Sequence, residues 1–172
     1  MRRQGIVMVI KFLKRCYMAG KKKQILIPQT HTTSFAGMTK KELREWCKRY
    51  YSQCFIGNKV KNLDLGIEIS FKRLGNKKTS YGAAIYPKKA AAIMVLDEML
   101  KYAIHTNWGE RKDDDPINVI AYCNFKCKIM IDKELCFFAI NVQICNDGKF
   151  HYSLDECRFK YKTSRKLSDS SV

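Results

Sequence analysis

Residues 122–144, YCNFKCKIMIDKELCFFAINVQI, consist of two apolar stretches separated by the polar triplet Asp132-Lys133-Glu134. Apolar and polar residues largely alternate in the first stretch, which is the period of a β-strand with one buried face. A short polar break between two such stretches favours a tight turn that joins antiparallel strands. This region therefore predicts a β-hairpin, with strands over about 117–132 and 135–145.

Two further strands are expected on either side of this hairpin. The turn residues Asn146-Asp147-Gly148 precede a third strand, over about 149–154. Far upstream, residues 63–71 alternate strictly between apolar and mostly polar positions, which predicts another half-buried strand. Because the last connections are short, we expect a three- or four-stranded antiparallel sheet.

Two helices complete the predicted fold. Thr39 and Glu42 have the spacing of a capping box, and apolar residues follow at helical intervals to about residue 54. Pro87 suits the first turn of a second helix, which is apolar over much of its circumference to about residue 104, with His105 at its C-terminal end. The expected fold class is α+β, with helices packed on one face of the sheet.

The charge of the chain is strongly positive, because 33 Lys and Arg outnumber 16 Asp and Glu and leave a net charge of +17. Such an excess attracts polyanions. We therefore expect RNA or another nucleic acid as the partner. The alternatives are a solvated basic surface without a selected partner, an acidic protein and an anionic membrane surface. No apolar run is long enough to span a membrane. The cysteines described below lead us to expect a cytoplasmic protein.

The positive charge is concentrated at the two ends. The first 41 residues contain ten Lys and Arg and no Asp or Glu. From this we expect a basic, poorly structured leader over 1–38, a folded domain over 39–157 and a basic flexible tail over 158–172.

The eight cysteines do not form a disulfide or zinc pattern. No Cys-x-x-Cys pair occurs, and no histidine lies among them at ligand spacing. Cys123 and Cys127 are an even number of residues apart on a predicted strand, so they share one face and are expected to be buried thiols. We therefore predict a reducing environment, no metal site and no cofactor.

The middle of the chain resembles a known family. Four blocks carry the resemblance: NLDLGIEISFKRLGNKK (62–78), KKAAAIMVLDEMLKYAIHTNW (88–108), YCNFKCKIMIDKELCFFAINVQI (122–144) and NDGKFHYSLDEC (146–157). Together they resemble a domain of the large polyvalent proteins of phages and mobile elements, which is grouped with the barnase, EndoU, colicin and RelE-like (BECR) nuclease fold. The resemblance implies a metal-independent ribonuclease fold that offers one sheet face to RNA, but it supplies no catalytic set.

Cleavage of RNA without a metal requires proton transfer and stabilisation of a charged phosphorane, which calls for His, Lys or hydroxyl groups around one phosphate. His105 is one candidate, although a histidine at a helix C-terminus also interacts favourably with the helix dipole. His151 and Ser153 share one face of the last predicted strand, although a solvent-facing surface also explains them. Lys72, at the exit of the strand over 63–71, is the candidate cation.

The loop after residue 71 supplies candidate RNA-binding residues. Arg73, Lys77 and Lys78 can reach backbone phosphates, and Tyr81 can stack on an unpaired base. A solvated basic loop is the alternative. Tyr122 and Phe125 are further stacking candidates, unless they are buried.

No P-loop, nucleophile elbow or zinc-protease motif occurs. Two functions follow from these observations. The first is a metal-independent ribonuclease. The second is a non-catalytic module that binds nucleic acid or protein, such as a counter-defence factor.

Overall fold

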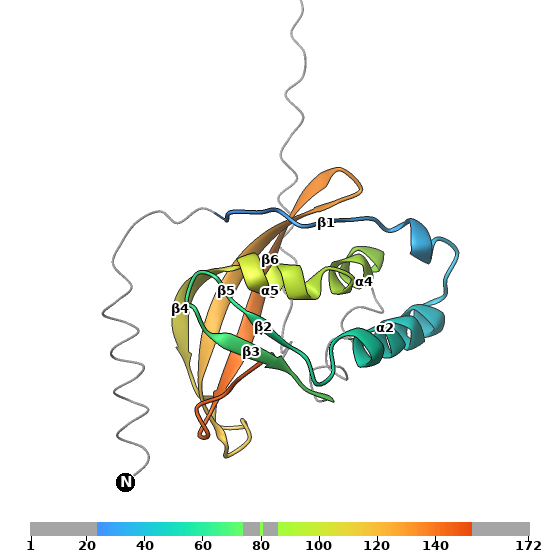
Figure 1. Ribbon diagram of the computed structural model, residues 1–172. Coiled ribbons are helices and arrows are strands. Elements are labelled where there is room, and N and C mark those ends of the chain that lie inside the picture. The colour runs from blue at the N-terminus through green and yellow to red at the C-terminus, as the bar shows by residue number, and fades with distance from the viewer. Residues whose placement is uncertain (1–23, 74–79, 81–85, 153–172) are drawn as a thin grey trace, which may run out of the picture.

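The computed structural model describes residues 24–73, 80 and 86–152 (Figure 1). Their elements follow in the order β1 (Gln29–Thr30), the 3-10 helix η1 (Thr33–Phe35), α2 (Lys40–Cys54), β2 (Lys59–Lys61), β3 (Glu68–Phe71), α4 (Pro87–Ile93), α5 (Leu96–Tyr102), β4 (Ile104–Glu110), β5 (Val119–Ile131), β6 (Glu134–Cys145) and β7 (Phe150–Tyr152).

The strands form one mixed, seven-stranded sheet. Its order is β1-β5-β6-β7-β3-β2, and β4 pairs with β5 beside β1. The pairs β1–β5 and β3–β7 are parallel, whereas the other pairs are antiparallel. The predicted three- or four-stranded antiparallel sheet is therefore wrong. Two of the additional strands, β1 and β2, are short edge strands held by backbone hydrogen bonds, which leave little trace in the pattern of side chains.

The sheet curls around α5 (Figure 1), which contacts both β5 and β2. The buried side chain of Asn62, directly after β2, holds this curl. Its amide nitrogen donates to the carbonyls of Leu100 and Ala103 at 2.7 and 2.9 Å, and its amide oxygen accepts from the backbone of Leu65 at 2.9 Å. Asn62 is thus fully satisfied, and it fixes the β2 edge of the sheet to the end of α5.

Asn62 also explains why the strand predicted over 63–71 is shorter than expected. Residues 62–66 form a turn, in which the Gly66 amide donates to the Asn62 carbonyl and Gly66 has a φ of 71°. A positive φ favours glycine. The alternation therefore describes a strand only over β3, and β2 precedes the turn.

The first helix was predicted correctly. Thr39 and Glu42 form both hydrogen bonds of a capping box at the start of α2. These bonds satisfy backbone donors that a helix N-terminus otherwise leaves unpaired.

The second predicted helix is wrong in its continuity and its end. It is divided into α4 and α5 at Met94 and Val95, and the Tyr50 hydroxyl donates to the Met94 carbonyl at 3.3 Å. The helix ends at Tyr102, so His105 lies in β4 and not at a helix terminus. Strand β4 occupies a segment that has no clear alternation.

The helices pack on one side of the sheet, which we call the inner face. Its strand residues are buried and include Ile69, Phe125, Ile129, Ile140 and Tyr152. Cys123 and Cys127 also point inward, which confirms their prediction as buried thiols, and burial raises the pKa of Cys127 to about 12. The opposite side of the sheet is the outer face. Among the described residues, no helix has the length and apolarity needed to cross a membrane.

Candidate nucleic-acid interface

The outer face of β5 and β6 divides into two halves that differ in exposure. One half comprises Lys126, Lys128, Phe137 and Ala139, which are all exposed, and we call it the open half. The other half comprises Tyr122, Gln143, Cys145 and the adjoining His151 of β7, which are at most 5% exposed, and we call it the covered half. Both halves lie on the same pair of strands.

The open half combines positive charge with an aromatic ring. Lys128 is paired across the strands with Phe137, and Lys126 with Ala139. The Lys128 ammonium lies 5.7 Å from the centre of the Phe137 ring, which is 39% exposed. The outward positions of β5 and β6 from 124 to 130 and from 135 to 141 contain no Asp or Glu. The open half therefore presents a ring and two cations without local carboxylates.

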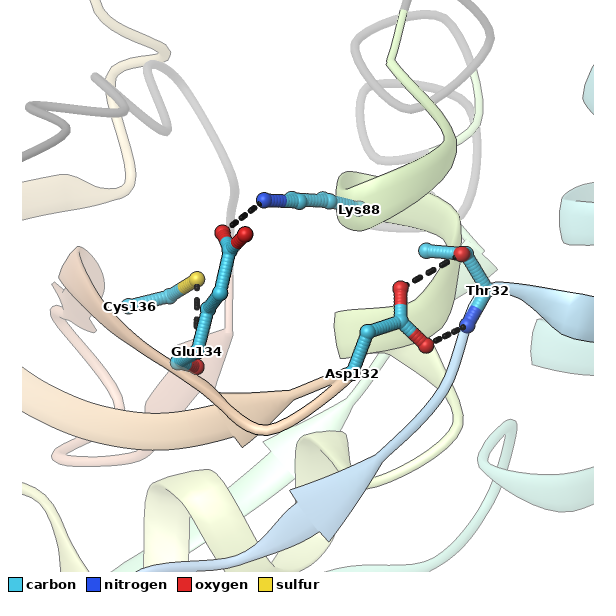
Figure 2. Close-up of polar contacts among 5 residues, drawn as sticks. All are labelled: Thr32, Lys88, Asp132, Glu134 and Cys136. Carbon is cyan, nitrogen blue, oxygen red and sulfur yellow. Dashed lines mark hydrogen bonds and ion pairs between the residues drawn. The ribbon is translucent and has the colours of Figure 1, made fainter. Parts of the chain in front are cut away.

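The carboxylates at the tip of this hairpin are bound by other residues, as Figure 2 shows. Asp132 accepts from the Thr32 backbone at 2.9 Å and from its hydroxyl at 2.5 Å. These hydrogen bonds lower the pKa of Asp132. Glu134 forms an ion pair with Lys88 of α4. The tip is thus anchored to α4 and to the segment after β1, and both carboxylates contact other residues of this chain.

The covered half lies beside the loop formed by residues 111–118. The Tyr122 hydroxyl donates to the Asp115 carboxylate, which also accepts from the Lys112 backbone at 2.7 Å. Although partial burial opposes it, hydrogen bonding by Tyr122 and Lys112 lowers the pKa of Asp115. Asp115 thus fixes the loop to β5.

His151 is the central residue of the covered half. It is paired with Ser70 of β3 on one side and with Gln143 of β6 on the other. His151 is 4% exposed, and within the described residues neither of its ring nitrogens has a hydrogen-bond partner. Burial, and then the positive charge of Lys72, lower the pKa of His151. These effects favour the neutral form of the imidazole.

The structure also brings together a group that the sequence analysis missed. Cys145 at the end of β6, Asp147 in the turn and His151 of β7 each offer one ligand atom, and these atoms lie within 4.8 Å of one another. The signal was present as Cys-x-Asp-x-x-x-His across the predicted turn. It was missed because the cysteines were compared with zinc motifs and not with the geometry of a hairpin.

The two candidate histidines do not meet. His105 points into the inner face, is 3% exposed, and has its ring centre 4.7 Å from that of Trp108 and 5.7 Å from that of Phe125. His151 lies on the outer face. A single phosphate therefore cannot contact both side chains in this arrangement.

The other predicted residues are placed as follows. Lys72 and Arg73 are exposed directly after β3, and the charge of Lys72 acts on both His151 and Cys145. Ser153, Lys77, Lys78 and Tyr81 lie outside the described residues.

Tyr122 and Phe125 are buried, which argues against base stacking. Phe137, the exposed ring, was missed, although its place between the inward residues Cys136 and Phe138 could have revealed it.

Comparison with protein families explains the resemblance noted in the sequence. A family model described as large polyvalent protein-associated domain 3 matches residues 38–152. The chain belongs to this family. The matched range extends from α2 to β7, so both halves of the outer face lie within large polyvalent protein-associated domain 3. Comparison with curated proteins and with solved structures finds no match, and membership of the BECR nuclease fold stays a prediction.

Proposed function

We propose that this large polyvalent protein-associated domain 3 binds single-stranded RNA on its open half, as part of a phage or mobile element. The observation that carries the proposal is the exposed Phe137 ring opposite Lys128, with Lys126 as the next cation on the same face, on a surface without outward carboxylates. Unpaired bases stack on exposed aromatic rings of sheets, while lysines hold the phosphates.

The charge of the whole chain supports the same partner. The net charge is +17, and most of this excess lies in the basic residues near the two ends of the sequence, outside the described residues. These residues attract any polyanion, since phosphate contacts are independent of sequence. The open half adds a stacking contact, which selects unpaired bases over a duplex.

Binding is better supported than cleavage. His105 and His151 are both buried, and they lie on opposite faces of the sheet. Lys72 and Lys149 are close enough to His151 to act on its charge, but the imidazole is only 4% exposed and is not open to a phosphate. Metal-independent cleavage is therefore the second candidate, and the same binding reactions test it.

The test is fluorescence anisotropy of the full chain with labelled single-stranded RNA over a series of salt concentrations. Loss of one base stack in Phe137→Ala should weaken binding by about 1–3 kcal/mol, or roughly 5- to 150-fold. Lys126→Gln and Lys128→Gln should each reduce the slope of log affinity against log salt by about 0.7. An unchanged affinity in Phe137→Ala would refute the proposed surface.

Two control variants separate this surface from general charge effects. Leu63→Ala removes an exposed apolar side chain beyond β2, a strand that pairs with neither β5 nor β6, and should leave the affinity unchanged. Lys101→Gln removes an exposed cation from α5 and should have a smaller effect than Lys128→Gln. Gel analysis of the same RNA after incubation in EDTA reports cleavage, because shortened RNA would establish a metal-independent nuclease.

A further inference from the structure

The hairpin between β6 and β7 places three potential metal ligands at one point of the covered half. Cys145 ends β6, Asp147 lies in the turn, and His151 lies in β7. The Cys145 sulfur, an Asp147 carboxylate oxygen and a His151 ring nitrogen are all within 4.8 Å of one another. This spacing requires only small side-chain movements to reach the ligand separations of a tetrahedral ion.

The turn that carries these residues is well defined. The Cys145 amide donates to the Lys149 carbonyl at 3.0 Å, and the Gly148 amide donates to the Cys145 carbonyl at 2.9 Å. The Asp147 carboxylate accepts from the Lys149 amide at 3.0 Å. Since the backbone is fixed by these bonds, the three side chains are held near one another before any ion binds.

His151 supplies an independent reason to expect a ligand. It is 4% exposed, and both its ring nitrogens lack hydrogen-bond partners within the described residues. A buried polar group without a partner destabilises the fold. Coordination of one nitrogen to a metal would remove part of this cost.

The chemistry of the donors indicates the class of ion. Cys145 offers sulfur, His151 offers nitrogen and Asp147 offers oxygen, which is a mixed set that suits zinc and its tetrahedral analogues. Hard cations such as magnesium and calcium prefer oxygen ligands alone. Asp147 is exposed, so an ion can reach the site from solvent. We propose that Cys145, Asp147 and His151 bind a zinc-type divalent ion, with water as the fourth ligand.

Two cations oppose this binding and provide a sensitive test. The Lys149 ammonium lies 3.4 Å from the Asp147 carboxylate, and Lys72 acts on both Cys145 and His151. The Lys149 side chain is 68% exposed and is therefore able to turn into solvent when an ion enters. Lys149→Gln should tighten metal binding, because it removes a positive charge beside the ion.

The experiment is a titration of the metal-free full chain with cobalt(II), followed by displacement with zinc. One equivalent of cobalt should produce the absorption of a cobalt–thiolate bond. Cys145→Ser should abolish this absorption. His151→Gln and Asp147→Asn should weaken metal binding by at least about tenfold, because even the mutation of a residue that only supports a metal ligand typically lowers the affinity that much. Cys54→Ser, at an exposed cysteine on α2, is the matched control and should bind cobalt normally.

The wild-type chain gives a second measurement, in which His151→Gln serves only to assign the signal. Zinc should shift the ring-nitrogen NMR signals of one histidine to those of a metal-bound imidazole, and this signal should be missing in His151→Gln. Thiolate absorption that survives in Cys145→Ser, or a wild-type chain without a zinc-shifted histidine, would overturn the proposal. Phe137→Ala should bind cobalt normally, so failure of this site and failure of RNA binding are distinguishable.

Discussion

The open and covered halves of the outer face use the same two strands and the same alternation, yet they provide opposite environments. At the open half, Lys128 and Phe137 are exposed cross-strand partners. On the same face, Tyr122 and Gln143 are also cross-strand partners, four residues along each strand from Lys126 and Ala139, but each is only 5% exposed. The distance along the strands is short, so the strands alone do not set the environment.

What lies next to each half explains the difference. Beside the covered half are β7 and the loop 111–118, which is fixed through Asp115. The open half adjoins the hairpin tip, whose polar contacts point toward α4 and Thr32 (Figure 2). A strand pattern therefore assigns a side chain to a face, whereas neighbouring segments decide whether that face meets solvent.

The largest expected effect comes from placing the same charge in each half. Gln143→Lys would bury an unpaired cation and should lower the free energy of unfolding by several kcal/mol. Ala139→Lys adds the same charge to an exposed site on the same strand and face, and should change stability by less than about 0.5 kcal/mol. Urea denaturation measures both, and equal effects would contradict the division into two halves. Gln143→Leu, which removes the amide without adding charge, should be much milder than Gln143→Lys.

A smaller effect is expected when the contact that fixes the loop is removed. Tyr122→Phe deletes the hydroxyl that donates to Asp115 and should cost about 1–2 kcal/mol, because a hydrogen bond to a charged group is lost. Thermal or urea unfolding of Tyr122→Phe, Asp115→Asn and the double variant gives the coupling energy. Additive single effects would show that this contact does not stabilise the loop.

The smallest effect is a pH dependence at the hairpin tip. Hydrogen bonds from Thr32 lower the pKa of Asp132 in the folded protein. Their contribution to stability is therefore full above the ordinary carboxyl pKa of about 4, and it is lost as the pH falls through the lower folded value. The difference in unfolding free energy between wild type and Asp132→Asn should shrink in acid.

The Asp132→Asn comparison tests charge and not backbone strain, since asparagine also tolerates the φ of 50° found at this position. Asp113→Asn, in the exposed part of loop 111–118, is the control. A difference for Asp132→Asn that stays constant from neutral to acid pH would argue against the Thr32 contact in solution.

Local signals predicted the elements that are held together by residues close in sequence. The capping box of Thr39 and Glu42 identified α2, and the triplet around Lys133 identified the turn between β5 and β6. Continuity was predicted less well. The division between α4 and α5, and the turn from Asn62 to Gly66, depend on hydrogen bonds to Tyr50 and Leu100, which are remote in sequence.

The candidate sites follow the same rule. Alternation would have assigned Phe137 to the outward side of β6. The resemblance to a large polyvalent protein-associated domain is confirmed by the family model over residues 38–152. By contrast, His105 was expected at a helix end, and only the pairing of β4 with β5 reveals that it faces the core. The meeting of Cys145, Asp147 and His151 likewise depends on how the turn between β6 and β7 folds.

By itself, the sequence determined the strong positive charge, the first helix and the long hairpin, because composition, capping and alternation are local properties. Only the tertiary structure decided the curl of a seven-stranded sheet around α5, the opposite faces of His105 and His151, and the covering of one half of the outer face. The physical reason is that burial and edge pairing arise from segments far apart in the chain, and the alternation of one strand contains no information about what packs against it.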